Sequence, residues 1–350
     1  MITAARHSPR VRLAARLALL LAGLGLGTAL IVFLLRSANL NQLGSDFSHA
    51  EYGYLVPALV AFAANLLLKL PRWKLLYGDD APDWDTMFGA INVGYAVNTL
   101  LPARLGDLVR AYWVRDRTSL SMVRTLSTIA LERVLDGLAV FVMFLVIAPT
   151  VAFPATLRRS AVAAGTLFVV VLLAMVVLAF LATRENWFSR RLARLETGRW
   201  GLISRLVRLA TAGLQALRSW RVLALVALYT AIIWLANAVL LWLVARAFHI
   251  DVSLAAGALG NAAVSLGMVV PSTPGYIGVF DYLIVMTLGL YGVHRTPALA
   301  AAFVFHAIAF IPVTIIGIVY IARSGLQSTL RLLRKDVETA ADLGSPAGLA

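Results

Sequence analysis

The stretch NVGYAVNTLLPARLG, residues 92–106, predicts an apolar helix that stops before it can cross a bilayer. Proline removes an amide donor and clashes with the preceding turn, so we expect no continuous helix through Pro102. The stretch NAAVSLGMVVPSTPG, residues 261–275, is interrupted in the same way. We therefore expect the apolar regions 86–114 and 254–292 to be broken near their middles.

The two broken regions resemble each other at an offset of 169 residues. The aligned pairs are Asn92 with Asn261, Pro102 with Pro271 and Gly106 with Gly275. Interrupted helices in matching positions of two oppositely oriented units are typical of transporters with a site near the membrane midplane. We therefore predict an inverted repeat whose units cover residues 54–148 and 222–322. The alternative is a chance similarity between two helices broken by glycine and proline.

The composition excludes a water-soluble globular enzyme. Of 350 residues, 61% are hydrophobic and 14% are charged, whereas a soluble domain has about 25% charged residues. Six stretches meet the requirement of a bilayer core, which is about 20 apolar residues per helix. They are residues 14–35, 54–70, 125–148, 160–182, 222–246 and 298–322. We predict an all-α polytopic membrane protein, a single integral membrane domain over 1–350, with about six full transmembrane helices and two broken or re-entrant helical hairpins.

Charge predicts the orientation. The net charge is +14, and basic residues accumulate on the cytoplasmic side of membrane proteins. The basic segments are 1–13, 184–221 and 324–350, so both termini are expected in the cytoplasm. Segment 184–221 is predicted to be an amphipathic helix on the cytoplasmic leaflet. We expect a multi-pass protein of a prokaryotic plasma (inner) membrane, with anionic lipid rather than nucleic acid as the partner of its basic surface.

Polar residues in the first unit form a candidate site for a lipid headgroup. A charge at mid-bilayer costs about 2.5–3.5 kcal/mol on insertion scales, so such residues need a reason. Arginine can bind phosphate through a two-pronged fork, and the acids can balance it or hold an amino headgroup. The alternative is an ion-pair cluster that ties hairpin to helix, and the two roles can coexist. The candidates are Asn98, Pro102, Arg104, Gly106, Asp107, Arg110, Glu132, Arg133 and Asp136.

The second unit supplies further candidates around its break. Broken helices leave free amides and carbonyls, and a helix amino end favours an anion. His306 lies within an apolar span, where it either belongs to the site or is only hydrogen-bonded to a neighbour. Lys69, Arg72 and Lys74 are expected to be snorkelling anchors at the end of their span, with contact to a lipid phosphate as the lesser alternative. The candidates of this unit are Pro271, Ser272, Thr273, Pro274, Gly275, Asp281 and His306.

Four motifs in order resemble the flippase-like family, the transmembrane domain of lysylphosphatidylglycerol synthases and its stand-alone relatives. They are PRWKLLYG at 71–78, NTLLPARLGDLVRAYWV at 98–114, LERVLDG at 131–137 and VVPSTPGYIGVFDYL at 269–283. The resemblance covers about residues 10–325 and implies a domain that moves or presents a lipid between leaflets. Relatives often carry Glu where Asp107 and Asp281 stand, and Arg near the position of His306.

These observations predict a lipid flippase or lipid-handling transporter with a polar cavity between the two hairpins. The expected partners are an anionic phospholipid, a hopanoid-type lipid or a polyprenyl-linked lipid, and a cytoplasmic lipid-biosynthetic enzyme. The alternative is a membrane enzyme or accessory subunit that acts on a lipid-linked substrate by glycosyl or phosphoryl transfer. The longest hydrophilic segment has about 38 residues, too few for an aminoacyl-transferase domain. We therefore do not expect a synthase. We also expect no catalytic residues, metal or cofactor.

Overall fold

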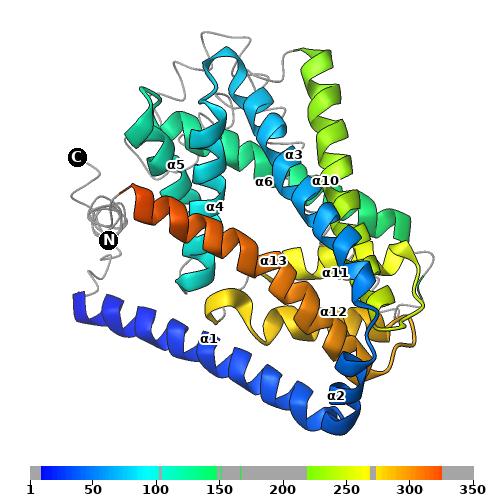
Figure 1. The fold of residues 1–350 in the computed structure, drawn as a ribbon. Coiled ribbons are helices and arrows are strands. Elements are labelled where there is room, and N and C mark those ends of the chain that lie inside the picture. The colour runs from blue at the N-terminus through cyan, green and yellow to red at the C-terminus, as the bar shows by residue number, and fades with distance from the viewer. Residues whose placement is uncertain are drawn as a thin grey trace. The chain divides into compact units, whose positions relative to one another are not determined.

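The computed structural model describes residues 9–101, 105–147, 219–268 and 273–324, together with the isolated positions 151 and 166. Every regular element within these ranges is helical, which confirms the predicted all-α class (Figure 1). The α-helices are α1 (Pro9–Ser37), α2 (Leu40–Ser48), α3 (Leu55–Tyr77), α4 (Trp84–Leu100), α5 (Gly106–Arg117), α6 (Met122–Ile147), α10 (Trp220–Ala247), α11 (Leu254–Gly267), α12 (Val279–Gly289) and α13 (Arg295–Arg323). Short 3-10 helices are η1 (Tyr52–Tyr54), η2 (Gly78–Asp80) and η5 (Pro274–Tyr276).

Three apolar segments of the described chain are long enough to cross a membrane: Tyr52–Asp80, Trp220–Ala247 and Arg295–Arg323. A 29-residue helix is about 43 Å long, more than the roughly 30 Å of a hydrocarbon core. A fourth candidate is Leu21–Ser37 followed by Leu40–Ser48, with a bend of 85° between them. These segments correspond to four of the predicted spans.

The fifth predicted span, 125–148, forms α6, but its middle carries Glu132, Arg133 and Asp136. The sixth, 160–182, lies outside the described residues apart from position 166. The segment predicted to be an amphipathic helix, as far as residue 218, and the tail from residue 325 also lie outside them. At the end of the second predicted span, the helix continues through Pro71 to Tyr77.

Both predicted breaks are present. The first separates α4 from α5, and the second separates α11 from α12 around η5. Gly275 and Gly278 have φ of 67° and 89°, a region that glycine adopts without the cost of a Cβ. The arms of each hairpin pack closely: a Cβ on Gly94 in α4 would lie 3.0 Å from the carbonyl oxygen of Gly106 in α5, and α11 packs along α12.

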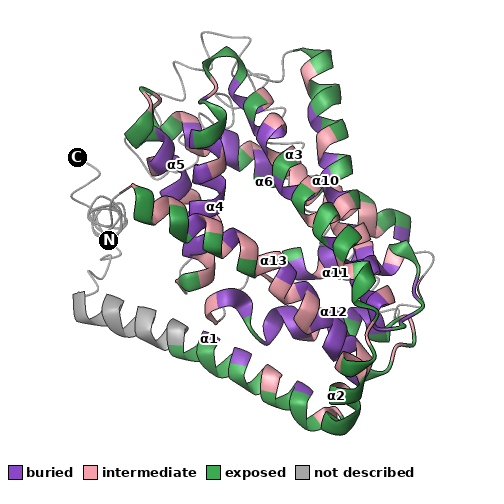
Figure 2. Ribbon diagram, in the orientation of Figure 1, coloured by how far each residue is buried: buried purple, intermediate pink, exposed green. Residues whose placement is uncertain are grey.

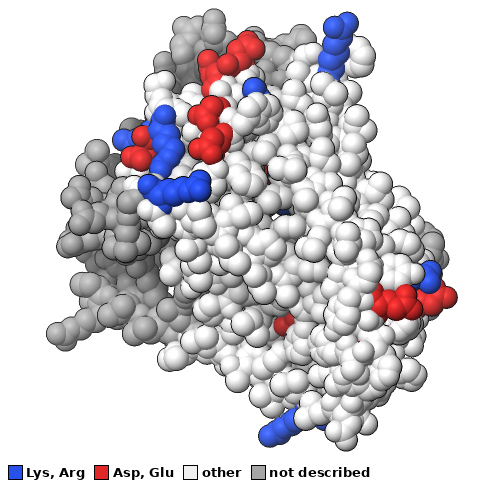
Figure 3. All heavy atoms as spheres, in the orientation of Figure 1, with Lys and Arg blue, Asp and Glu red and all other residues white. Residues whose placement is uncertain are grey.

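Large apolar side chains face outward along the long helices. On α10 they include Leu228, Ile232 and Leu235, and on α13 Ile311 and Ile315. Spacings of three and four residues place each set on one helix face. Figure 2 shows exposed residues along much of α10, and most of the surface in Figure 3 carries no charge. Such continuous apolar faces are unusual on soluble proteins and are covered naturally by lipid tails.

The chain divides into two compact units. Unit 1 comprises Met1–Leu59, Val97–Arg104 and Ala238–Ile311, and unit 2 comprises Val60–Ala96, Leu105–Asn237 and Pro312–Ala350. The division passes through α3, α4, α10 and α13. In unit 2 the core includes Trp73, Tyr77 and Met87, and in unit 1 it includes Ile284 and Leu299. The inverted orientation of the predicted repeat stays a prediction.

Asn92 in unit 2 and Asn261 in unit 1, which are aligned in the predicted repeat, make the same kind of hydrogen bond. Asn92 Nδ2 donates to the carbonyl oxygen of Phe88 over 2.8 Å, and Asn261 Nδ2 donates to that of Gly257 over 2.9 Å. In both cases the acceptor lies four residues earlier on the same helix. The local geometry of the two asparagines is thus the same, and the repeat itself stays a prediction.

Candidate functional site

Unit 2 gathers charged side chains of α3, α5 and α6 around Arg72. Arg72 donates from Nη2 to Glu132 Oε1 (3.0 Å) and from Nη1 to Asp136 Oδ1 (2.6 Å). Arg110 Nη2 lies 2.9 Å from the second carboxylate oxygen of Glu132. We call Arg72, Arg110, Glu132 and Asp136 the inner layer. Its two cations and two carboxylates balance, and all but Asp136 are almost fully buried.

Neighbouring aromatic and hydroxyl groups hold the inner layer in place. The Arg110 guanidinium lies 3.5 Å from the ring centre of Trp73, a cation–π arrangement. Trp73 Nε1 in turn donates to Thr128 Oγ1 over 2.9 Å. From α10, Trp234 Nε1 donates to Asp136 Oδ1 over 3.4 Å. The inner layer therefore joins four helices of unit 2.

Helical spacing explains how the sequence builds this cluster. Glu132 and Asp136 are four residues apart on α6 and share a face, as predicted, and both contact Arg72. Asp107 and Arg110 are three apart on α5, and both bond to side chains of α6.

The expectation that Arg72 is a surface anchor was wrong. Its side chain is 0% exposed, because α3 continues past Pro71 and turns Arg72 toward α6. One signal in the sequence could have found it. Two acids on one face of an apolar helix need a buried countercharge, since uncompensated charges are strongly destabilising there.

An outer layer of polar groups, Lys69, Tyr95, Asp107 and Arg133, is more open. Arg133 donates from Nη2 to Asp107 Oδ1 over 2.8 Å and from Nε to Asp107 Oδ2 over 3.3 Å. The side chain of Arg133 is 47% exposed and that of Asp107 is 39% exposed. Lys69 Nζ donates to the Tyr95 hydroxyl over 2.7 Å. Tyr95 also interacts electrostatically with Arg133 of the outer layer and with Arg72 of the inner layer. It is therefore an outer-layer residue that lies near the inner layer.

The outer layer carries a surplus of one positive charge. It contains two cations, Lys69 and Arg133, and one carboxylate, Asp107, which is taken by Arg133. No carboxylate within the described ranges pairs with Lys69. The hydroxyl of Tyr95 supplies no countercharge, so the Lys69 amine is suited to attract an anion.

Unit 1 builds a second polar arrangement at its break. His306 Nδ1 lies 2.9 Å from Asp281 Oδ1, and His306 Nε2 lies 2.8 Å from the carbonyl oxygen of Gly275. Asp281 Oδ2 accepts the N–H of Gly278 over 3.0 Å. The imidazole packs against two rings that also contact each other, with centres at 4.3 Å from Phe280 and 4.7 Å from Phe310. His306 is therefore bonded to neighbours, and those neighbours belong to the broken segment.

The remaining predicted residues are distributed as follows. Thr273 Oγ1 donates to the carbonyl oxygen of Ile277 over 2.7 Å, and Pro274 begins η5. Gly106 is the buried first residue of α5. Asn98 is half-buried near the end of α4, where its neighbour Thr99 lies close to Gly275 in unit 1. The predicted residues outside the described ranges are Pro102, Arg104, Pro271 and Ser272.

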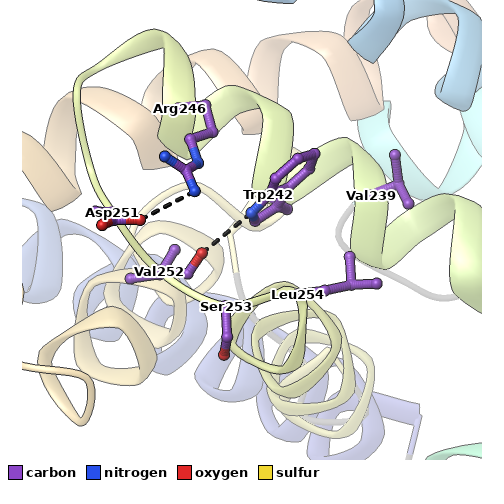
Figure 4. A pocket seen from close by; sticks show the side chains of 7 residues that line it. All are labelled: Val239, Trp242, Arg246, Asp251, Val252, Ser253 and Leu254. Carbon is purple, nitrogen blue, oxygen red and sulfur yellow. Dashed lines mark hydrogen bonds and ion pairs between the residues drawn. The ribbon is translucent and has the colours of Figure 1, made fainter.

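A cavity of about 460 Å³ opens in unit 1 at the turn between α10 and α11 (Figure 4). Arg246 pairs with Asp251 over 3.0 Å at its edge, and Trp242 Nε1 donates to the carbonyl oxygen of Val252 over 3.1 Å. None of the predicted site residues lines this cavity. Within the described ranges, no group of three or more His, Asp or Glu side chains is arranged to hold a metal ion.

Comparisons with known proteins match most of the chain. The family model described as the lysylphosphatidylglycerol synthase TM region matches residues 20–317. A UPF0104 membrane protein of Methanothermobacter thermautotrophicus is 25% identical over 304 residues, covering 82% of this chain and 90% of the relative. One of Methanocaldococcus jannaschii is 22% identical over 226 residues, covering 63% of this chain and 91% of the relative. No solved structure matches the chain significantly.

Proposed function

Because the chain belongs to the lysylphosphatidylglycerol synthase TM-region family, we propose that it is a flippase or lipid-handling transporter for lipids with an anionic headgroup. The family name links the chain to membrane lipid, and the apolar outward faces of α10 and α13 suit a protein surrounded by lipid tails. Movement between leaflets requires a polar place for the headgroup within this apolar frame. Unit 2 supplies such a place.

The surplus positive charge of the outer layer carries this proposal. A headgroup phosphate would accept from Lys69 and from the guanidinium of Arg133, while the acyl tails stay against apolar helix faces. Arg133 is half-exposed and can change partners, since an exposed ion pair is worth only about 0–1 kcal/mol. The inner layer is balanced and buried, so its role here is to hold the helices that present the outer layer.

The orientation is part of the proposal. We place the protein in the inner membrane of a prokaryote with both termini in the cytoplasm, where a lipid-biosynthetic enzyme is the proposed partner. The chain has no cysteine, so a cysteine added at either end is the only thiol. A membrane-impermeant thiol reagent should leave such a cysteine unlabelled in intact cells and label it after lysis. Labelling in intact cells would contradict this orientation.

Reconstituted liposomes test the transport. The purified protein is incorporated with fluorescent phosphatidylglycerol, a polyprenyl phosphate lipid or an uncharged hopanoid-type lipid, and leaflet exchange is followed by quenching of the outer leaflet. We expect exchange of the two anionic lipids above the level of protein-free liposomes. Exchange that never exceeds this level for any lipid would overturn the proposal. Formation of a glycosylated product from a nucleotide sugar would instead favour the enzyme alternative.

A charge-matched pair of variants tests the assignment of Lys69. Lys69→Gln removes the surplus charge, and loss of a charge-assisted hydrogen bond of about 1.5–3 kcal/mol predicts a decrease in anionic lipid exchange of about tenfold or more. Lys74→Gln is the control, because Lys74 lies on the same helix but stacks on Trp84 at 4.4 Å, away from the cluster. Equal effects of the two substitutions would remove Lys69 from the site.

A further inference from the structure

Both ring nitrogens of His306 face hydrogen-bond acceptors. Nε2 lies 2.8 Å from the carbonyl oxygen of Gly275, and Nδ1 lies 2.9 Å from the carboxylate of Asp281. We propose that Asp281 and His306 form a binding site for one proton, and that this proton holds the second break in its observed conformation. The site consists of residues outside the polar cluster of unit 2, so the inference goes beyond the proposed lipid transport and does not depend on it.

The argument for a bound proton is one of valence. A neutral imidazole carries a single N–H. If that hydrogen is on Nδ1, the lone pair of Nε2 points at a carbonyl oxygen, which can only accept. If it is on Nε2, the lone pair of Nδ1 points at an ionised carboxylate. Both contacts can be hydrogen bonds only when the pair holds one further proton, on the imidazole or on Asp281, shared between two coupled groups.

Burial makes this requirement strict. The side chain of Asp281 is 1% exposed and that of His306 is 13% exposed, so water has little access to relieve two opposed acceptors. An unsatisfied polar contact in such a place costs more than at the surface. The imidazole also packs against the rings of Phe280 and Phe310.

Asp281 is the carboxylate that bonds to His306 within the described residues. Three other titratable or charged groups on the surrounding elements contact aromatic rings. Tyr276 of η5 packs on Phe310 at 6.0 Å, and Tyr282 of α12 packs on Phe33 of α1 at 6.3 Å. Arg295, the first residue of α13, lies 5.5 Å from the ring centre of Phe33. Arg36 lies in the last turn of α1.

The same pair holds both ends of the broken segment. His306 binds the carbonyl of Gly275, and Asp281 binds the amide of Gly278. Together with Tyr276 (φ 58°), these two glycines are positions of the segment where the backbone enters the left-handed region. When the proton leaves, one of the two side chains must move, and the contact that it makes with the segment is lost. Proton release therefore loosens the turn at residues 275–278.

A single cysteine can report this loosening. Ile277 lies in the turn and is 53% exposed, and the chain contains no cysteine, so Ile277→Cys adds a unique thiol to the full-length protein in liposomes. The rate of maleimide labelling is measured from mildly acidic to mildly alkaline pH. It is compared with the rate for the same cysteine in an Asp281→Asn background, so that the titration of the thiol itself cancels in the ratio.

Asp281→Asn is the informative partner because it has the same shape. Its amide Nδ2 can donate to the lone pair of Nδ1 in a neutral His306, while its oxygen still accepts from Gly278, so the turn no longer needs the proton. We expect the ratio of the native to the Asp281→Asn rate to increase several-fold with increasing pH. A ratio that is constant across pH would overturn the proposal. His294→Gln, at an exposed position of the same unit, should leave the increase unchanged, and its loss in that variant would also count against the pair.

A spectroscopic measurement keeps the proposal testable if Asp281→Asn does not fold. Nitrogen-15 NMR of histidine-labelled native protein in nanodiscs, with His306 identified by its absence in His306→Gln, reports which ring nitrogens carry hydrogen. At neutral pH we expect either both nitrogens protonated or Nε2 protonated with Nδ1 accepting from a protonated Asp281. A neutral His306 that carries its hydrogen on Nδ1 would contradict the proton site.

Discussion

Each of the two hairpins pairs an acid near the start of its second arm with a base on the following long helix, but the surroundings of the two pairs differ. In the first, Asp107 at the start of α5 pairs with Arg133 on α6, 26 residues later. In the second, Asp281 at the start of α12 pairs with His306 on α13, 25 residues later. The first pair is half-exposed, with side chains 39% and 47% accessible, whereas the second is 1% and 13% accessible.

This difference separates two tasks. An arginine in an open pair keeps its charge at any physiological pH and can exchange a carboxylate for a phosphate. The histidine of the closed pair instead contacts Asp281 and the backbone of the break. We infer that the first hairpin serves the headgroup and that the second controls the conformation of its own turn.

The largest expected effect is on the inner layer of the first hairpin. Glu132→Gln removes the carboxylate that bonds to both Arg72 and Arg110, and losing one partner of a buried ion pair costs about 3–5 kcal/mol. The midpoint of thermal unfolding in detergent should decrease accordingly. Glu51→Gln is the control, because Glu51 faces His249 at the surface, where a pair is worth about 0–1 kcal/mol. Similar losses from both substitutions would contradict the buried network.

The next effect compares the close approaches in the two hairpins. Gly278 has a φ of 89°, and a Cβ there would overlap the backbone of Gly27 in α1. Gly278→Ala should therefore destabilise the protein by more than about 1 kcal/mol. Gly94→Ala, whose Cβ would lie 3.0 Å from a carbonyl oxygen, should cost less.

Gly44→Ala supplies the control for these two glycines. A Cβ at Gly44 in α2 would meet nothing within 4 Å, so alanine should be neutral or stabilise the helix by about 0.5–1 kcal/mol. Thermal unfolding of the three variants checks the order. If Gly44→Ala were as damaging as Gly278→Ala, the close contact between α1 and the second break would not be the cause.

The two hairpins also differ where their first helices begin. Asp83 caps α4 by accepting from the side chain and the backbone N–H of Thr86, whereas Ser253 before α11 makes no side-chain cap bond. We expect Asp83→Ala to cost about 1 kcal/mol, as for other N-caps, and Ser253→Ala to cost clearly less. Unfolding midpoints at neutral pH would test this order, and equal losses would speak against it.

The cap of α4 should depend on pH in one direction. The hydrogen bonds from the Thr86 side chain and backbone lower the pKa of Asp83 below its ordinary value. A carboxylate with a lowered pKa in the folded state stabilises above its unfolded pKa, and the stabilisation is lost as the pH falls through the folded value. The difference between native protein and Asp83→Ala should therefore be present at neutral pH and decrease in acid. A difference that grows in acid would contradict the cap.

The smallest expected change concerns the open pair itself. Asp107→Asn should alter the unfolding midpoint little, because a half-exposed ion pair contributes about 0–1 kcal/mol. It should, however, leave Arg133 free for phosphate and maintain or increase the exchange of anionic lipids, opposite to Lys69→Gln. A decrease in exchange would show that Asp107 is needed to orient Arg133.

Local features of the chain were sufficient for much of the architecture. Apolar length predicted the long helices, and proline and glycine predicted where both hairpins break, because each is a property of neighbouring residues and of the backbone. The spacing of Glu132 and Asp136 likewise predicted a shared face, which their common contact with Arg72 confirms.

The partners of those residues followed only from packing. Arg72 and Glu132 are 60 residues apart, and His306 and Gly275 are 31 apart, so no helical period relates them. The packing of the helices decides which charges are buried and balanced. It also decides that Lys69 carries the unpaired charge of the outer layer within the described ranges, and which acceptor faces each nitrogen of His306. Helix formation is decided over a few turns of chain, whereas the pairing of charges is decided by distance and burial in three dimensions.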